Sequence, residues 1–214
     1  DNAQLSDSVR RASLRSAFWR ARFEACGFEP DQPACLRDWH RLPLLDKPEL
    51  LEDQREHPAG GSLLAAPLGE VRRLHRTSGS TSTPFIVMLT ANDVAIAQSV
   101  GARALRCAGV REDDLVIHCL NYSMWSGGVT DHLCFETAGA AVIPYGVGNS
   151  RYLIETMQRL RPTAISCTPS YLVKLKELCR DELGLDPRSL GLRAAFLGGE
   201  GGLQQPAYRR RIED

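Results

Sequence analysis

The sequence has very little lysine, no excess of either charge and no long apolar run. Its only lysines are Lys47, Lys174 and Lys176, and Lys+Arg and Asp+Glu cancel at 26 each. Because the net charge is zero, no overall field favours nucleic acid or an acidic membrane surface. No apolar stretch approaches the roughly 20 residues of a membrane span. The first residues, DNAQLSDSVRR, lack the basic and apolar regions of a signal peptide. We therefore expect a cytoplasmic protein with no nucleic-acid or membrane partner.

The cysteines lack the spacing of a metal site. Seven are scattered along the chain and none forms a C-x-x-C pair, so we expect no zinc site in this segment. Cys119 and Cys167 fall within apolar runs, where cysteine usually behaves as a small buried hydrophobe. The pattern favours reduced thiols in a protein core, and we assign no metal ligand.

Strand-like and helix-like segments alternate along most of the chain. Short, continuously apolar runs are typical of strands buried on both faces of a sheet; they occur at 85–89, 115–120, 140–144, 163–167 and 192–197. Segments with helical periodicity lie between and after them, at 91–108, 128–138, 150–160, 170–183 and 204–213. This alternation predicts an α/β fold with layered, mainly parallel β-sheets flanked by helices.

The N-terminal part differs from this pattern. Residues 7–26 are expected to form one amphipathic helix that ends at Gly27. Its inward-facing residues would be Val9, Leu14, Phe18 and Phe23. We therefore divide the chain into an N-terminal helical segment, residues 1–70, and an α/β portion, residues 71–214. The chain ends inside a helical pattern without a closing turn, so we expect it to be part of a longer protein.

Residues suited to helix ends stand at the junctions between these segments. Asp46, Thr90 and Asn149 can accept hydrogen bonds from a first helical turn, as N-cap side chains do. Gly109 and Gly139 suit the other end, where helices commonly finish in a left-handed residue. These residues support the predicted helix boundaries.

One loop carries hydroxyl groups and glycine without any bulky side chain. Thr77, Ser78, Gly79, Ser80 and Thr81 follow one another between the runs VRRLH and FIVMLT. The backbone N–H groups and hydroxyls of such a loop can converge on an anion, and glycine lets the backbone turn tightly. The Walker A string G-x-x-x-x-G-K-[ST] is absent, which excludes that type of nucleotide site. Loops of this composition also occur as simple connections, so composition alone leaves both interpretations open.

Further motifs follow this loop in a fixed order. They are Ala108-Gly109-Val110-Arg111 with Asp114, Tyr122–Gly128 with His132 and Glu136, Gly139–Pro144, Thr168-Pro169-Ser170-Tyr171, and Gly198-Gly199-Glu200. Together with the hydroxyl-rich loop and Pro84, they resemble the N-terminal part of the adenylate-forming (AMP-binding) enzymes, and among these the phenylacetate–CoA ligase family. The resemblance covers about residues 70–213.

The resemblance implies an AMP-forming acid–CoA ligase. An aromatic carboxylic acid would react with ATP, bound with Mg²⁺, to give an acyl-adenylate, and thioester formation with coenzyme A would follow. The implied ATP phosphate-binding residues are Thr77, Ser78, Gly79, Ser80 and Thr81, and the implied adenine- or AMP-binding residues are Gly198, Gly199 and Glu200. The implied acid pocket consists of Tyr122, Trp125, Ser126 and Gly127.

We assign no catalytic residue within the chain. In the family that the chain resembles, the catalytic lysine belongs to a small C-terminal domain, which would lie beyond residue 214. The chain alone is therefore not expected to complete the reaction.

The sequence departs from the family pattern near the loop and after the Gly-Gly-Glu motif. Ser82 stands where the family has a second loop glycine, and the usual lysine is absent, with Thr83 and Phe85 in this stretch. Losing that cation weakens the hold on pyrophosphate. Gly201-Gly202 replaces the proline-tryptophan pair that often follows the motif. These departures concern mainly the strength of ATP binding.

Three of the residues in these motifs also have simpler interpretations. Trp125 can be an aromatic side chain packed in the core, although an aromatic wall suits a planar aryl acid. His132 can be a helix histidine with satisfied hydrogen bonds, so we leave it out of the site. The carboxylate of Glu200 can serve a structural hydrogen bond while its backbone lines the adenine site.

Two alternatives to the aryl-CoA ligase remain open at this point. An adenylating enzyme with the same motifs can pass the acyl group to a carrier-protein or enzyme thiol, which makes a carrier protein a further candidate partner. A non-catalytic, truncated relative would bind nucleotide or acid at most, and Ser82 and the absent lysine are the features that favour it.

Overall fold

The computed structural model describes residues 2–28, 40–41, 44–77 and 83–213. The chain forms two compact units, residues 1–93 and 94–214. This division reflects which residues pack together and does not test the domain boundary expected at residue 70, which stays a prediction. None of the helices in the described part of the chain is long and apolar enough to cross a membrane.

The first unit begins with two short helices in place of the single helix expected over residues 7–26. These are α1 (Asn2–Arg15) and α2 (Ala17–Ala25). The break falls at Ser16, whose hydroxyl accepts a hydrogen bond from the N–H of Trp19 at 3.3 Å and so caps α2. A serine side chain competes for backbone hydrogen bonds, which is why it can start a new helix within an apparently continuous pattern.

The inward face of these helices is only partly as expected. Val9 and Phe23 are buried and form a small core with Phe28. Phe18 is half-buried. Leu14 was expected to face inward and is instead 60% exposed, so that prediction is wrong. The break at Ser16 ends the single helical face on which Leu14 was placed.

Helix α3 (Lys47–Glu56) starts as the sequence predicts. The N–H of Glu49 donates to Asp46 Oδ1 at 3.0 Å, and the N–H of Asp46 donates to Glu49 Oε2 at 3.2 Å. These reciprocal bonds satisfy two backbone donors at the helix N-terminus. Farther along the helix, the amide of Gln54 pairs with both backbone groups of Ile86, at 2.7 Å and 3.0 Å.

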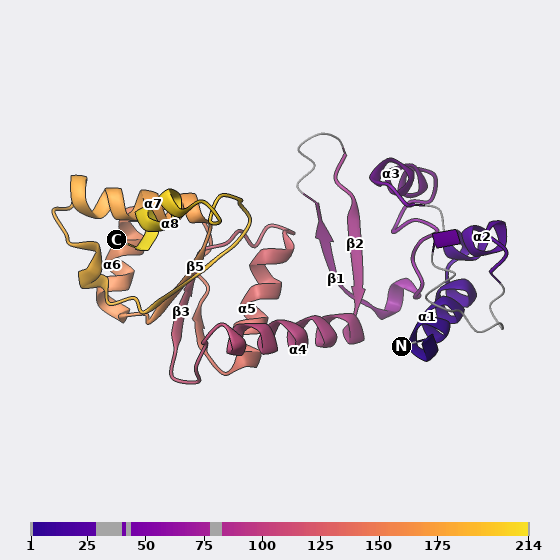
Figure 1. Ribbon diagram of the computed structural model, residues 1–214, viewed down its shortest axis with the longest axis horizontal. Coiled ribbons are helices and arrows are strands. Elements are labelled where there is room, and N and C mark those ends of the chain that lie inside the picture. Colours follow the sequence, from indigo (N-terminus) through magenta and orange to yellow (C-terminus); the bar gives the residue numbers. More distant parts are fainter. Residues whose placement is uncertain (1, 29–39, 42–43, 78–82, 214) are drawn as a thin grey trace. The chain divides into compact units, whose positions relative to one another are not determined.

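A two-stranded antiparallel sheet completes the first unit (Figure 1). After a 3₁₀ turn at Leu68–Glu70, strand β1 (Val71–Arg76) pairs with β2 (Ile86–Thr90). Strand β2 is half-buried along its whole length, so the expectation that the run at 85–89 is buried on both faces is wrong. A two-stranded sheet cannot cover both faces of a strand with neighbouring layers, as a larger layered sheet does.

The second unit is built on a four-stranded parallel sheet in the order β4-β3-β5-β6. Its strands are β3 (Leu115–His118), β4 (Ala141–Ile143), β5 (Ala164–Cys167) and β6 (Ala194–Leu197). Its helices are α4 (Ala91–Cys107), α5 (Ser126–Ala138), α6 (Ser150–Leu160), α7 (Pro169–Glu177) and α8 (Pro206–Glu213). The layered, mainly parallel α/β fold is thereby confirmed.

Helices cover both faces of this sheet. Val116 and Ala164 contribute to a core shared with α4 and α5, which includes Ala102 and Phe135. The neighbouring residues Ile117 and Ile165 contribute to a second core with α6 and α7. This alternation follows from the period of two along a strand and explains why β3 and β5 are continuously apolar.

The helix ends of the second unit agree with the sequence. Asn149 Oδ1 accepts the N–H groups of Arg151 and Tyr152 at 3.1 Å and 3.2 Å, so it caps α6. Gly139 ends α5 at φ +107°, a left-handed conformation that glycine adopts readily. The helix expected over 170–183 is shorter, because α7 passes into a π-helical turn at Leu178–Glu182. A final 3₁₀ turn, Pro187–Leu190, leads into β6.

Candidate functional site

Predicted site residues and residues of the Thr168–Tyr171 motif follow the carboxyl ends of three neighbouring strands. Tyr122 and Trp125 follow β3, Thr168 and Ser170 follow β5, and Gly198 follows β6. The chain leaves β3 toward α5, which covers one face of the sheet, and leaves β5 toward α7, which covers the other. In open α/β sheets, ligands bind outside the carboxyl ends of the strands where such connections diverge.

The loop after β3 is fixed by two glycines at the start of α5. A Cβ at Gly128 would stand 2.3 Å from the carbonyl oxygen of Asn121, and one at Gly127 would stand 2.6 Å from the ring of Trp125. The helix can therefore approach its own entry loop only because these residues lack a side chain. Ser126, the first residue of α5, is exposed.

A chain of polar side chains joins this loop to the outside of α5. The Tyr122 hydroxyl lies 2.9 Å from His132 Nδ1, and His132 Nε2 lies 3.0 Å from Glu136 Oε1. Burial raises the pKa of Tyr122 to about 12, so its hydroxyl stays protonated at neutral pH. His132 thus has partners on both ring nitrogens, as in the simpler interpretation of this residue, and it positions Tyr122.

A second histidine beneath the loop was not singled out from the sequence. His118, at the end of β3, is fully buried, and its Nε2 lies 2.9 Å from the carbonyl oxygen of Gly128. Its Nδ1 is buried and has no hydrogen-bond partner among the described residues. Burial lowers the pKa of His118, which favours the neutral ring. The sequence signal was weak because this histidine stands within an apolar strand.

The turn after β6 lies against the loop after β3. Gly199 has φ +83°, and a Cβ built on it would stand 3.3 Å from Trp125 Cη2 and 3.6 Å from Thr168 Cγ2. A predicted acid-pocket residue, Trp125, and a predicted adenine-binding residue, Gly199, are therefore neighbours. A Cβ at Gly198 or Gly201 would meet no atom within 4 Å, so the backbone on either side of Gly199 borders open space.

The carboxylate of Glu200 is held at the N-terminus of α7. Its oxygens accept the N–H of Ser170 at 3.0 Å and the hydroxyl of Ser170 at 2.7 Å. These bonds hold the pKa of Glu200 below its usual range, since they favour the ionised form. The structural hydrogen bond expected of this carboxylate is thus present, while its part in adenine binding stays a prediction.

The hydroxyl-rich loop is described only at its edges. The N–H of Thr77 donates to the carbonyl oxygen of Phe85 at 3.0 Å, and the Thr77 hydroxyl accepts the N–H of Phe85 at 3.0 Å. These two bonds extend the β1–β2 pairing by one residue. Ser78, Gly79, Ser80 and Thr81, predicted to bind the ATP phosphates, and Ser82 lie outside the described residues, so their role stays a prediction.

A cavity of about 330 Å³ lies on the face of the sheet that α4 and α5 cover. It is lined by Gly101, Ala104, Leu105, Leu120, Asp131, Cys134, Phe135, Ser166, Phe196, Leu197 and Gly198. Burial raises the pKa of Asp131 to about 6. Sequence reasoning missed this residue, although a signal existed: Asp131 stands three or four positions from Gly127, Gly128, Cys134 and Phe135, all of which are buried.

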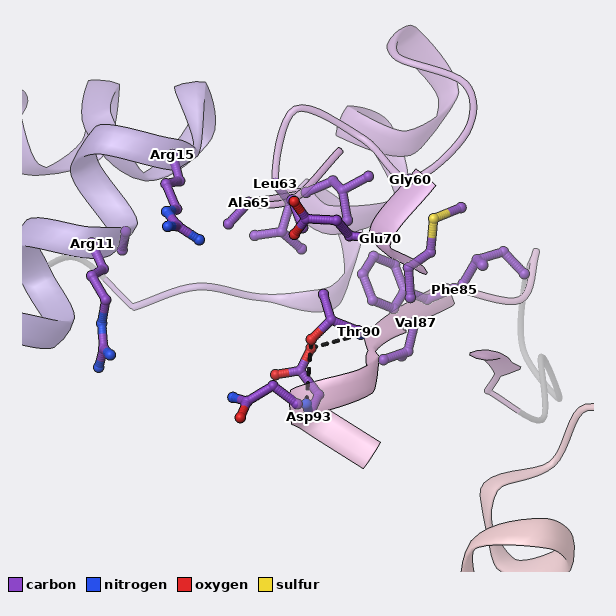
Figure 2. Close-up of a pocket in the computed structure, with 16 residues that line it drawn as sticks. Arg11, Arg15, Gly60, Leu63, Ala65, Glu70, Phe85, Val87, Thr90 and Asp93 are labelled. Atoms are coloured by element: carbon purple, nitrogen blue, oxygen red, sulfur yellow. Dashed lines mark hydrogen bonds between the residues drawn. The ribbon is translucent and has the colours of Figure 1, made fainter. Parts of the chain in front are cut away.

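A larger hollow of about 640 Å³ lies in the first unit (Figure 2). Phe85, Val87 and Leu63 form part of its wall, and the guanidinium groups of Arg11 and Arg15 lie on the side of α1. At the start of α4, Thr90 and Asp93 cap the helix, with the N–H of Thr90 2.8 Å from Asp93 Oδ2. The described residues that line this hollow include none of the predicted site residues.

The described residues contain no group of three His, Cys, Asp or Glu side chains arranged to hold a metal ion. The Mg²⁺ expected with ATP would be held mainly by the phosphates, and most of the residues predicted to bind these lie outside the described residues. Mg²⁺ therefore stays a prediction from the resemblance.

Comparison with known sequences places most of the chain in one family. A sequence model described as "AMP-binding enzyme" matches residues 65–210. The chain is 35% identical to the phenylacetate-coenzyme A ligase of Pseudomonas putida, over 98% of the chain and 46% of that relative. It is 34% identical to the phenylacetate-coenzyme A ligase of Thermus thermophilus, over 94% of the chain and 43% of that relative. The chain thus spans less than half the length of these relatives.

Solved structures give the same result for the fold. A crystal structure of 2-hydroxyisobutyryl-CoA ligase, in complex with 2-HIB-AMP and CoA, is similar to the chain with a TM-score of 0.91 and 32% identity. The similarity covers 99% of this chain and 45% of that one. A second structure, a chimera of the protein RpMatB bound to ATP, has a TM-score of 0.52 at 17% identity and so shares the fold alone.

Proposed function

The chain belongs to the AMP-binding enzyme family, and we propose that the protein containing it is an AMP-forming acid–CoA ligase. The observation that carries this proposal is the similarity, over 99% of the chain, to a ligase crystallised with an acyl-adenylate and CoA. The proposed protein activates a carboxylic acid with ATP and then transfers the acyl group to coenzyme A.

Two displacement reactions make up this activity. First, a carboxylate oxygen attacks the α-phosphorus of ATP, and pyrophosphate leaves with its electron pair to give an acyl-adenylate. Second, the CoA thiol loses its proton and attacks the acyl carbon, and AMP leaves. The first barrier consists mainly of charge and alignment, because two anions must meet in line. Mg²⁺ bound to the phosphates would neutralise part of that charge.

The chain's own residues would hold the reactants. We propose that the backbone at Gly198 and Gly199 borders the adenylate and that the loop 77–81 binds the ATP phosphates. The carboxylate of Glu200 fixes that backbone through Ser170. We assign no proton transfer to any described residue, and the chain by itself is not expected to complete the reaction.

We propose further that the acid is aromatic. Trp125 would supply an aromatic wall beside Gly199, with Tyr122 as a second ring in the same loop, and aromatic rings pack well against planar aryl acids. Both relatives compared above are named for phenylacetate. The structurally similar ligase is instead named for 2-hydroxyisobutyryl-CoA, so a short hydroxy acid is the second candidate class.

Exchange of labelled pyrophosphate into ATP tests the proposal directly. The full-length protein would be assayed with a panel of aryl, aliphatic and hydroxy acids. Exchange that depends on an aryl acid, followed by thioester formation when CoA is added, is the expected result. Exchange with aliphatic acids alone would overturn the aromatic assignment and leave the ligase chemistry intact.

Two outcomes would favour the alternatives. Exchange without transfer to CoA would favour a carrier-protein or enzyme thiol as the acceptor. No exchange with any acid would favour a non-catalytic relative, and the variant Ser82→Gly then separates two cases. A large gain in ATP affinity in that variant would indicate an enzyme with a weakened phosphate loop, whereas no change would indicate a protein that has lost the activity.

A further inference from the structure

The cavity between α4, α5 and the sheet contains one carboxyl group on an otherwise largely apolar wall. Asp131 lines this cavity together with Leu120, Phe135 and Phe196, and among the described residues the only other polar side chains on the wall are the Ser166 hydroxyl and the Cys134 thiol. Cavities of a few hundred Å³ with a small number of placed polar groups are typical of small-molecule sites. The placement of one acidic group in such a wall therefore needs an explanation.

The helix itself turns Asp131 toward the sheet. Residues three and four positions away on α5 share its face, and Gly127, Gly128, Cys134 and Phe135 at those positions are all buried. Glu136 and Thr137, which lie on other faces of the helix, are exposed. The position of Asp131 is thus set by the same periodicity that buries the apolar face of α5.

The structure gives Asp131 no hydrogen bond or ion pair with any described residue. Asp131 is partly buried, and a carboxylate that loses part of its hydration without receiving protein hydrogen bonds is unfavourable. Burial raises the pKa of Asp131 to about 6, as expected for an uncompensated carboxyl group. A ligand that donates a hydrogen bond or carries positive charge would supply the missing partner.

The same cavity reaches the proposed adenylate site. Gly198 lines it, and Gly198 is also the first residue of the segment expected to border the nucleotide. An acid whose carboxylate lies beside Gly198 would present the rest of its body to the cavity. Asp131 would then meet a substituent on that body.

We propose that Asp131 determines substrate specificity by accepting a hydrogen bond from an amino group on the acid, so that the substrate is an amino-substituted carboxylic acid. This inference rests on the proposed ligase function of the site. An amino group is favoured over a hydroxyl because an alkylammonium group carries the positive charge that best offsets a partly buried carboxylate, and an uncharged arylamine still donates N–H hydrogen bonds to it.

The test uses pairs of acids that differ only by an amino group, such as benzoate and 4-aminobenzoate, phenylacetate and 4-aminophenylacetate, and 3-phenylpropanoate and phenylalanine. Hydroxy-substituted analogues form a third arm. Pyrophosphate exchange by the full-length wild-type protein is compared with that of Asp131→Asn, which keeps the size of the side chain and removes its charge. Asp181→Asn removes the same charge from an exposed position and is the matched control.

For the wild type, kcat/KM is expected to be roughly 10-fold or more higher for at least one amino-substituted acid than for its unsubstituted parent. A single buried hydrogen bond to a charged group typically gives discrimination of this size. Asp131→Asn should remove most of this preference without changing KM for ATP, and Asp181→Asn should keep it. Thermal unfolding checks that the Asn variant is folded.

Three results would overturn the inference. The first is an equal kcat/KM of the wild type for every amino-substituted acid and its parent. The second is an equal fall in kcat/KM for both acids of a pair in Asp131→Asn. The third is a higher kcat/KM for hydroxy-substituted than for amino-substituted analogues. Should no acid support exchange, the proposed function fails, and calorimetric titration of the same acids decides the inference separately. The inference holds if the wild type binds an amino-substituted acid more tightly than its parent acid and Asp131→Asn abolishes this difference. It is rejected if the substitution leaves the binding of both acids unchanged.

Discussion

The indole ring of Trp125 lies beside Gly199, so the loop after β3 and the turn after β6 are neighbours. A Cβ at Gly199 would come within 3.3 Å of Trp125 Cη2. Gly199 also adopts φ +83°, where a side chain is unfavourable by roughly 1–2 kcal/mol. The backbone conformation therefore strongly favours glycine at this position, and a Cβ would in addition need Trp125 to shift by a few tenths of an ångström.

Gly199→Ala is expected to raise KM for ATP by several-fold and to lower the rate of pyrophosphate exchange, because the turn must move away from its present position. Gly201→Ala is the matched control in the same segment, since a Cβ there meets no atom within 4 Å. Steady-state exchange kinetics of both variants check the prediction. Equal kinetics in the two variants would show that this turn does not border the nucleotide.

Replacement of Trp125 separates a binding role from a packing role. Trp125→Ala removes the ring that covers Gly127 and Gly199, and KM for an aryl acid should rise about 10-fold if this ring packs on the substrate. Trp125→Phe should retain most of the binding, since the family that the chain resembles commonly has Phe at this position. A fall in the unfolding midpoint of Trp125→Ala without any change in KM for the acid would mean that the ring only packs the core.

Most of the fold could be predicted because the local pattern of apolar residues indicates which segments are buried as strands or helices. The runs around Val116 and Ile165 are apolar on both faces, and each became a strand covered by helices on both sides. Asn149 and Gly139 ended helices where their side-chain chemistry and conformational freedom indicated. In each case the necessary information lies within a few neighbouring residues.

The remaining features depend on residues distant in sequence. β1, with several charged residues, was not predicted as a strand, because its pairing with β2 is what stabilises it. The contact between Trp125 and Gly199 follows from the order of the strands, which no local pattern specifies. Asp131 combines both kinds of information. Helical periodicity places it on the same face as the buried residues of α5, but its lack of a protein partner is visible only in three dimensions.

An ion pair at the amino end of β3 should contribute strongly to stability. Arg193 donates two hydrogen bonds to Asp114, one of them to Oδ1 at 2.8 Å, and the side chain of Asp114 is only 1% exposed. The Thr163 hydroxyl donates to the same Oδ1 at 2.6 Å, and the N–H of Arg111 donates to Oδ2 at 2.8 Å. Burial raises the pKa of Asp114, but these hydrogen bonds outweigh it and hold the pKa below its usual range.

Arg193→Met should therefore lower the free energy of unfolding at pH 7 by about 2–3 kcal/mol, because a buried carboxylate loses its charged partner. A carboxyl group with a lowered pKa stabilises the folded state above its unfolded pKa near 4, and this contribution disappears as the pH falls through the folded pKa. The difference between wild type and variant should thus narrow below pH 4. Urea unfolding of the full-length protein at several pH values provides the measurement.

The control for this variant is Arg209→Met. Arg209 forms an exposed pair with Glu213 within one helix at 2.7 Å, and such pairs contribute about 0.5 kcal/mol or less. A similar loss of stability in both variants would contradict the importance given to the Asp114 pair.

Asp131 should also affect the stability of the protein, but its ionised carboxylate should destabilise the folded state, whereas that of Asp114 stabilises it. The pKa of Asp131 is raised from 3.8 to about 6, so between these values the folded state binds a proton that the unfolded state has released. Stability contributed by this group is therefore lost as the pH rises through that window, and the cost above pH 6 is on the order of 1–3 kcal/mol. Among the described residues that line the cavity, the thiol of Cys134 is the only other titratable group.

Asp131→Asn should accordingly make the ligand-free protein more stable at pH 7.5, and the gain should shrink to near zero at pH 4, where wild-type Asp131 is protonated in the folded state. The exposed Asp181→Asn variant should change the free energy of unfolding by less than about 0.5 kcal/mol at either pH. Urea unfolding at pH 4, 5, 6 and 7.5 gives the comparison. A variant that is less stable than wild type at pH 7.5 would mean that the Asp131 carboxylate already has a stabilising partner. In that case a ligand amino group would not be needed to explain its burial.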